Sequence, residues 1–113
     1  AVGVLGSFTQ TPDMLEGEDE WINAYKELAG SDPGPYSPQA YDAVRVVAEA
    51  IKQADSTDGD KIVAALEAID GLELFSGPLK FTPQHTLSAG GFVIVEVGPD
   101  GVFKLKVNPA TDY

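Results

Sequence analysis

The residues from Pro38 to about Ala54 form the most strongly patterned segment of the 113-residue chain. Ser37 followed by Pro38 is typical of a helix start, because serine caps free backbone N–H groups and proline fits the first helical turn. The apolar positions that follow cover well over half of a helical circumference: Ala40, Tyr41, Ala43, Val44, Val46, Val47, Ala48, Ala50 and Ile51. We therefore expect a helix that is buried over much of its surface, and the fold must supply neighbours to cover it.

Two further helices are expected, one on each side of this segment. The first begins at Pro12 after a Thr11 cap, ends at Gly30, and places these apolar residues on one face: Trp21, Ile22, Tyr25, Leu28 and Ala29. The second follows the cap-rich stretch 56–60, ends at Gly71, and keeps these residues in register: Ile62, Val63, Leu66 and Ile69. The chain therefore carries three predicted helices.

The predicted strands are few. Residues 1–8 are apolar and consistent with a buried strand, and 79–81 is a short strand candidate. Residues 92–97 and 102–107 form a hairpin about the Gly-Pro-Asp-Gly turn at 98–101. Two or three strands cannot cover three helices in a two-layer fold. This imbalance indicates that other parts of the same protein, or a partner chain, complete the structure.

Charge and composition exclude several classes of function. Eighteen acidic against 7 basic residues give a formal net charge of -11, which argues against nucleic acid and against an anionic membrane surface. No apolar run approaches the roughly 20 residues that cross a bilayer. The chain has no cysteine, so disulfides and thiolate metal sites are excluded. Because its first residues resemble the middle of a strand, we expect the chain to begin inside a longer sequence.

The polar residues do not indicate catalysis or metal binding. His85 is the only histidine and lies in a predicted polar loop, where no second His or Cys can complete a site. The acidic stretch 55–60 superficially resembles a calcium loop, but helix capping explains it. The acidic run 16–20 is typical of a solvated helix end and not of two carboxylates held across a cleft. We expect no enzyme, catalytic residue, metal or cofactor.

Tyr36 and Tyr41 are the strongest candidates for binding. They flank the start of the predicted helix at Pro38, where aromatic rings can contact a small solute while hydroxyl and backbone N–H groups satisfy its polar ends. The alternative is that both tyrosines only contribute to packing, and the residues alone leave both interpretations open.

The same region carries a resemblance to a known family. Residues 34–44, Gly-Pro-Tyr-Ser-Pro-Gln-Ala-Tyr-Asp-Ala-Val, and 47–51, Val-Ala-Glu-Ala-Ile, resemble the aromatic helix start of the type I periplasmic binding proteins. These include the leucine/isoleucine/valine-binding proteins of ABC transporters. Residues 62–69, 75–81 and 91–106 resemble later landmarks of that family in the expected order. The resemblance covers essentially the whole chain, although each motif is short.

The resemblance implies an α/β fold in which this chain is the C-terminal fragment of a two-lobed protein. Residues 1–8 and 92–107 would be strands of the second lobe, and 13–81 would supply helices and a strand of the first lobe. Residues 9–12 and 88–91 would be hinge crossings. The family's main clamps on an amino acid lie N-terminal to this segment, so they cannot be assigned here.

The resemblance also implies a function. Tyr36 and Tyr41 would approach the cleft, where a branched-chain or related amino acid is bound for delivery to membrane permease subunits. Pro38 stands where the family usually has a small residue. The location would be periplasmic or extracellular, with attachment to the cell envelope by a lipid at a missing N-terminus as one arrangement.

The alternative function is a free-standing acidic interaction domain that self-associates and has no role in transport. In either case the isolated chain is expected to form a homodimer, because exchanging elements with a second copy covers apolar faces at low cost.

Overall fold

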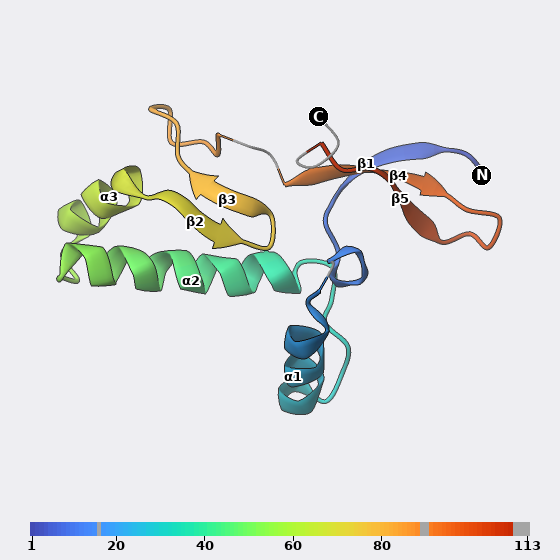
Figure 1. Ribbon diagram of the computed structural model, residues 1–113, viewed down its shortest axis with the longest axis horizontal. Coiled ribbons are helices and arrows are strands. Elements are labelled where there is room, and N and C mark those ends of the chain that lie inside the picture. Colours follow the sequence, from blue (N-terminus) through green and yellow to red (C-terminus); the bar gives the residue numbers. More distant parts are fainter. Residues whose placement is uncertain (16, 89–90, 110–113) are drawn as a thin grey trace. The chain divides into compact units, whose positions relative to one another are not determined.

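The computed structural model describes residues 1–15, 17–88 and 91–109. Its elements, in chain order, are β1 (Leu5–Thr9), the 3-10 helix η1 (Pro12–Met14), α1 (Asp19–Ala29), α2 (Ser37–Ala54), α3 (Gly59–Ala68), β2 (Asp70–Leu74), β3 (Gly77–Lys80), β4 (Phe92–Val97) and β5 (Phe103–Val107) (Figure 1). They form two compact units, Ala1–Ser37 with Gly91–Tyr113, and Pro38–Gly90. The expected α/β class is confirmed, and the units are described one at a time.

The first unit contains an antiparallel sheet in the order β1-β4-β5. Strand β4 lies in the middle, and its Val93 and Val95 are buried, at 1% and 2% exposure. The predicted hairpin is confirmed: the Gly98 N–H donates to the Val102 carbonyl, and Gly101 adopts a positive φ of 77° that the tight turn requires. The C-terminal hairpin therefore supplies the interior of this unit.

The N-terminal part of the first unit differs from prediction in two ways. Strand β1 begins at Leu5 and not at Ala1, and Leu5 is 58% exposed where a buried strand was expected. The prediction of a helix beginning at Pro12 was also wrong, because only the single turn η1 forms there. Gly17 adopts a left-handed φ of 79°, which helical residues do not take, so α1 starts after it.

Helix α1 ends where the sequence predicted. Gly30 takes a left-handed φ of 70°, and its N–H donates to the Lys26 carbonyl in a common type of helix termination. No residue of α1 is buried, and Leu28 on the expected apolar face is 91% exposed. The described residues therefore cover the apolar face of α1 only in part, since Trp21, Ile22 and Tyr25 are half-buried.

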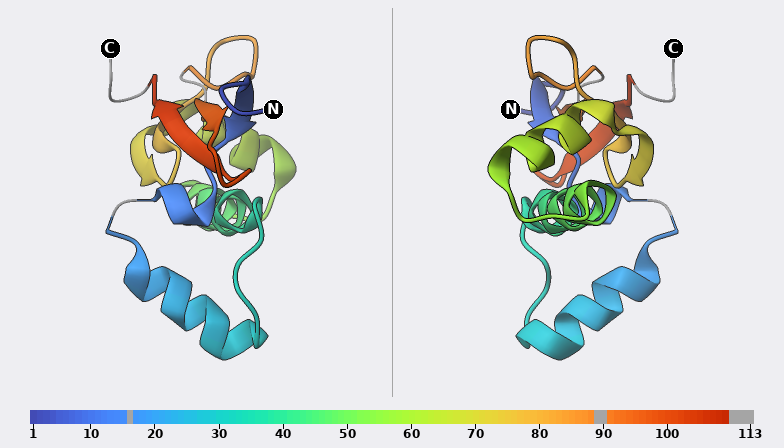
Figure 2. Two further views of the ribbon diagram at one scale, coloured as in Figure 1. Left: turned by 90° about the vertical axis from the view of Figure 1, so that its right-hand side faces the viewer. Right: turned by 90° about the vertical axis from the view of Figure 1, so that its left-hand side faces the viewer.

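The second unit is built on α2, whose predicted extent is confirmed. Helix α3 and the β2–β3 hairpin lie on the same side of α2 (Figure 1 and Figure 2). The core between them consists of four buried residues, Ala50, Ala65, Ile69 and Leu79, and these partly buried neighbours: Val46, Ala54, Ile62, Leu66, Leu72, Leu74 and Phe81. The fully buried Ala50 allows the helix and the hairpin to approach closely.

The sequence missed β2. Helix α3 ends at Ala68 and not at Gly71, and the chain turns directly into a strand that pairs with β3. Gly71 has a φ of 83° and lies at the register shift between Asp70 and Leu72. A glycine at a bulge interrupts the apolar alternation by which strands are recognised, which explains the error.

One face of α2 is also less covered than expected. Its buried residues are Pro38, Asp42 and Ala50, whereas Val44 is 70% exposed and Val47 is 50% exposed. The expectation that α2 is buried over much of its surface is therefore not met within the described residues.

Candidate functional site

Tyr36 lies in the first unit, on the loop that precedes α2. Its ring centroid is 6.3 Å from that of Phe8 on β1, and Phe8 stacks on Phe103 of β5 at 6.5 Å with an interplanar angle of 12°. Tyr36 and Phe103 are both more than half exposed, at 63% and 58%. Three distant segments thus contribute an aromatic cluster of Phe8, Tyr36 and Phe103, of which the sequence predicted only Tyr36 as a candidate.

Tyr41 lies in the second unit, near the start of α2. Its ring centroid is 5.7 Å from that of Phe75, at the end of the β2–β3 hairpin, and the Arg45 guanidinium carbon is 6.0 Å from the Tyr41 centroid. Tyr41 is 47% exposed, so part of its ring faces away from these neighbours. Phe75 is the residue that the sequence missed here. Phe75 was missed because the sequence did not predict β2, the strand that ends just before Phe75 and places it beside α2.

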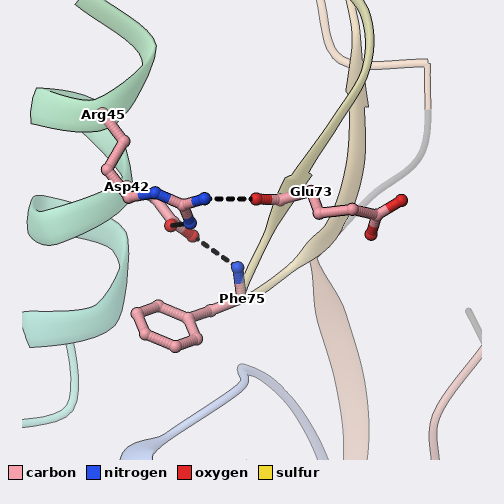
Figure 3. Close-up of polar contacts among 4 residues, drawn as sticks. All are labelled: Asp42, Arg45, Glu73 and Phe75. Atoms are coloured by element: carbon pink, nitrogen blue, oxygen red, sulfur yellow. Dashed lines mark hydrogen bonds and ion pairs between the residues drawn. The ribbon is translucent and has the colours of Figure 1, made fainter. Parts of the chain in front are cut away.

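Asp42 connects α2 to the same hairpin (Figure 3). Its side chain accepts the Phe75 backbone N–H at 2.8 Å with one oxygen and an Arg45 N–H at 3.2 Å with the other. Arg45 also donates to the Glu73 carbonyl at 2.8 Å. Two backbone groups on either side of Leu74 are therefore held by two side chains of one helical turn.

Asp42 is the only buried charged residue among those described, with 5% exposure. Burial raises the pKa of its carboxyl above the ordinary value, while the Phe75 N–H and the Arg45 guanidinium act in the opposite direction. The net direction means that these partners offset only part of the free-energy cost of desolvating the charge. Asp42 therefore fixes the geometry of the hairpin more than it stabilises the fold.

His85 and the acidic stretch 55–60 have structural explanations. The His85 Nε2 lies 3.0 Å from a Glu67 carboxylate oxygen in an exposed pair, beside a shallow apolar hollow lined by Val63, Leu66 and Phe81. Asp58 accepts the Lys61 N–H at 3.2 Å and caps α3, as predicted.

The described residues contain neither a candidate metal site nor a candidate membrane-spanning helix. Across residues 1–15, 17–88 and 91–109, no three His, Cys, Asp or Glu side chains gather closely enough to hold a metal ion. Within the same ranges, no helix has the length and apolar character needed to span a membrane.

The sequence matches a family model described as periplasmic binding protein, over residues 1–101. The chain belongs to the periplasmic binding protein family. The match covers strands β1 and β4, all three helices and the β2–β3 hairpin, and ends before β5; it confirms the resemblance drawn from the motifs. Members of this family bind solutes and are not enzymes, and the family implies a periplasmic or extracellular location. A search of curated protein sequences finds no match.

Solved structures agree with this family assignment. The chain is similar to a substrate-binding protein of an ABC transporter from Desulfitobacterium hafniense in complex with Leu, with 26% identity and a TM-score of 0.73 over 94% of this chain and 32% of that one. It also shares its fold with the leucine-binding protein LivK from Thermotoga maritima, with 23% identity and a TM-score of 0.74 over 96% of this chain and 32% of that one. The chain thus spans about a third of the length of these structures.

A more distant structure widens the range of solutes. The chain shares its fold with a solute-binding protein from R. palustris in complex with benzoate, with 17% identity and a TM-score of 0.68 over 92% of this chain and 29% of that one. The fold is therefore found in proteins that hold chemically different small acids.

Proposed function

We propose that this chain is the C-terminal part of a solute-binding protein that delivers a branched-chain or related amino acid to an ABC transporter. The observation that carries the proposal is the family match over residues 1–101 together with the similarity to a protein in complex with Leu. The proposed partners are the free amino acid and the membrane permease subunits. Residues 1–8 and 92–107 would then belong to one lobe and residues 13–81 to the other.

The proposed mechanism is closure of two lobes around the solute, without a chemical step. Hinge closure around a ligand is a common way in which such proteins signal the bound state to a partner. Tyr36 and Tyr41 are proposed to contact the solute, because each presents a partly exposed ring fixed by an aromatic neighbour. Fixed rings bury apolar area on binding at a low cost in conformational entropy.

We further propose that the complete protein acts outside the cytoplasm, where a lipid at its N-terminus could attach it to the cell envelope. The net charge of -11 suits solubility and argues against electrostatic attraction to anionic lipid headgroups.

The test is calorimetric titration of a protein that contains this chain and the sequence upstream of it. Free valine, isoleucine, leucine, phenylalanine and benzoate are the ligands. Saturable 1:1 binding of at least one branched-chain amino acid is expected, and the 113-residue chain alone is expected to bind weakly or not at all. Absence of binding across the five ligands would contradict the proposal.

Self-association is the second candidate, favoured by the exposed apolar residues of α2, Val44 and Val47. The isolated chain is expected to sediment as a dimer at high micromolar concentration, because pairing removes these residues from water. A monomeric mass at that concentration would exclude self-association as the chain's function.

A further inference from the structure

We infer that Asp42 is a positioning residue of the proposed solute site, holding Phe75 against Tyr41 so that the two rings together form a wall that selects the solute's side chain. The inference rests on the proposed function and deepens it. It adds Asp42, Arg45 and Phe75 to the residues that determine specificity, although only Tyr41 was predicted from the sequence.

Two hydrogen bonds hold the end of β2 and the residue that follows it beside α2. The Asp42 carboxylate accepts the backbone N–H of Phe75 at 2.8 Å, so the bond fixes the main chain from which the Phe75 ring projects. Arg45 donates to the Glu73 carbonyl at 2.8 Å, two residues earlier, on β2. These two anchors fix both the position and the direction of the strand end beside α2 (Figure 3).

The residues that anchor the hairpin, Asp42 and Arg45, also lie next to the Tyr41 and Phe75 rings. Tyr41 precedes Asp42 on α2, and its ring lies 5.7 Å from Phe75, with an interplanar angle of 40°. Arg45 lies over the Tyr41 ring at 6.0 Å, so one guanidinium contacts the ring, the carboxylate and the strand. Displacing the Asp42 carboxylate would therefore move both members of the aromatic pair.

A contribution to stability does not by itself explain why Asp42 is buried. A buried ion pair commonly contributes little net stability, because desolvation opposes the Coulomb attraction. Asp42 is the buried member of this pair, and its raised pKa means that Arg45, whose side chain is 38% exposed, offsets only part of the desolvation cost. What Asp42 and Arg45 contribute is therefore the fixed position of Phe75 relative to the Tyr41 ring. Tyr41 is 47% exposed, so one of the two rings held in this arrangement lies partly at the surface.

The experiment is a titration series on the upstream-extended protein, comparing the wild type with Asp42→Asn. The ligands are alanine, valine, leucine and phenylalanine, and the readout is the ratio of Kd values between large and small side chains. Asparagine keeps the shape of Asp42 but has one acceptor oxygen where the carboxylate has two, so it cannot accept from both the Phe75 N–H and Arg45. The ratio is expected to change by about three- to tenfold, the range that corresponds to losing one aromatic pair.

Two variants make the result specific. Phe75→Leu removes the ring and leaves the backbone N–H in place, so it should change the same ratio, and the double variant should change it no further. Asp58→Asn makes the same chemical change at the exposed cap of α3 and should leave the ratio unaltered. A merely structural role for Asp42 would weaken all ligands alike and leave the ratio constant.

The outcomes separate this inference from the proposed function. If the wild type binds and the ratio is unchanged in Asp42→Asn, or in Phe75→Leu should Asp42→Asn not fold, the positioning role is wrong and the proposed function stands. If the wild type binds none of the four amino acids, both fail. A ratio that changes in both variants and not in Asp58→Asn supports the inference.

Discussion

The two faces of α2 differ in how completely they are covered. On one face, Ala50 is fully buried in the core with Leu79, and Asp42 accepts a hydrogen bond from the β2–β3 hairpin. On the other face, Val44 and Val47 are equally apolar in sequence but are 70% and 50% exposed. The same helix thus has one face that is packed into a core and one face that the described residues leave exposed.

This difference shows what the sequence pattern measures. An apolar stripe records that a residue is buried somewhere in the functional protein, but it does not record which segment covers it. Relatives that share the fold are about three times as long, which is consistent with a cover that lies outside this chain. The covered face can be tested in the chain itself, and the open face only in a longer protein.

The largest effect is expected for Leu79→Ala on the covered side. Leu79 is 4% exposed in the core cluster, so the truncation should lower the free energy of unfolding by about 2–4 kcal/mol through lost burial and a cavity. Val44→Ala on the open face should change it by about 0.5 kcal/mol or less in the 113-residue chain, measured at low micromolar concentration where that chain is expected to be monomeric. Urea denaturation measures both. Equal losses would remove the distinction between the faces.

A smaller effect is expected when α2 is enlarged at two alanines two residues apart. Ala50→Leu inserts a side chain where α2 approaches the hairpin and α3, and should cost about 1–3 kcal/mol by overpacking. Ala48→Leu places the same side chain on an exposed position and should be neutral within about 0.5 kcal/mol. If Ala48→Leu proved the more damaging of the two in thermal unfolding, the assignment of the faces would be reversed.

The smallest effect is the pH dependence of Asp42→Asn. Because burial raises the pKa of Asp42, the folded protein holds this proton more tightly than the unfolded chain does. The contribution of Asp42 is therefore fully present below the unfolded pKa of about 4 and is lost as pH rises through the folded value. The stability difference between wild type and Asp42→Asn should be largest in acid and shrink toward neutral pH.

Urea unfolding of both proteins from about pH 3 to about pH 7 measures this difference directly. Comparing two proteins cancels the titration of the other carboxylates, which both share. A difference that grows toward neutral pH would mean that the charged pair stabilises the fold, and the argument for positioning would lose one of its supports.

Much of the local structure followed from the sequence. Helix α2, the Gly30 end of α1, the Asp58 cap and the C-terminal hairpin all depend on neighbouring residues, and all were confirmed. Where glycine allowed a positive φ, prediction failed: Gly17 delays α1 and Gly71 conceals β2. Backbone bends of this kind are decided by packing that a linear pattern does not contain.

The candidate site was predictable only in part. Tyr36 and Tyr41 were found from their place at a helix start, but whether they bind solute stays a prediction. Phe8, Phe75 and Phe103 reach them through strand pairing and through segments far apart in sequence. Asp42 was not singled out from the sequence, and its burial became visible only once β2 was placed against α2.

The most direct test of the account is cysteine labelling on the open face of α2. The chain has no native cysteine, so Val44→Cys is a single reporter in the 113-residue chain, with Asp60→Cys on the exposed start of α3 as its control. In that chain, at a concentration well below the high micromolar range in which it is expected to dimerise, maleimide should label both positions at similar rates. In the upstream-extended protein, it should label Val44→Cys many times more slowly than Asp60→Cys, after correction for any upstream cysteine. Equally fast labelling of both positions in the upstream-extended protein would contradict the claim that the remainder of a solute-binding protein covers this face of α2.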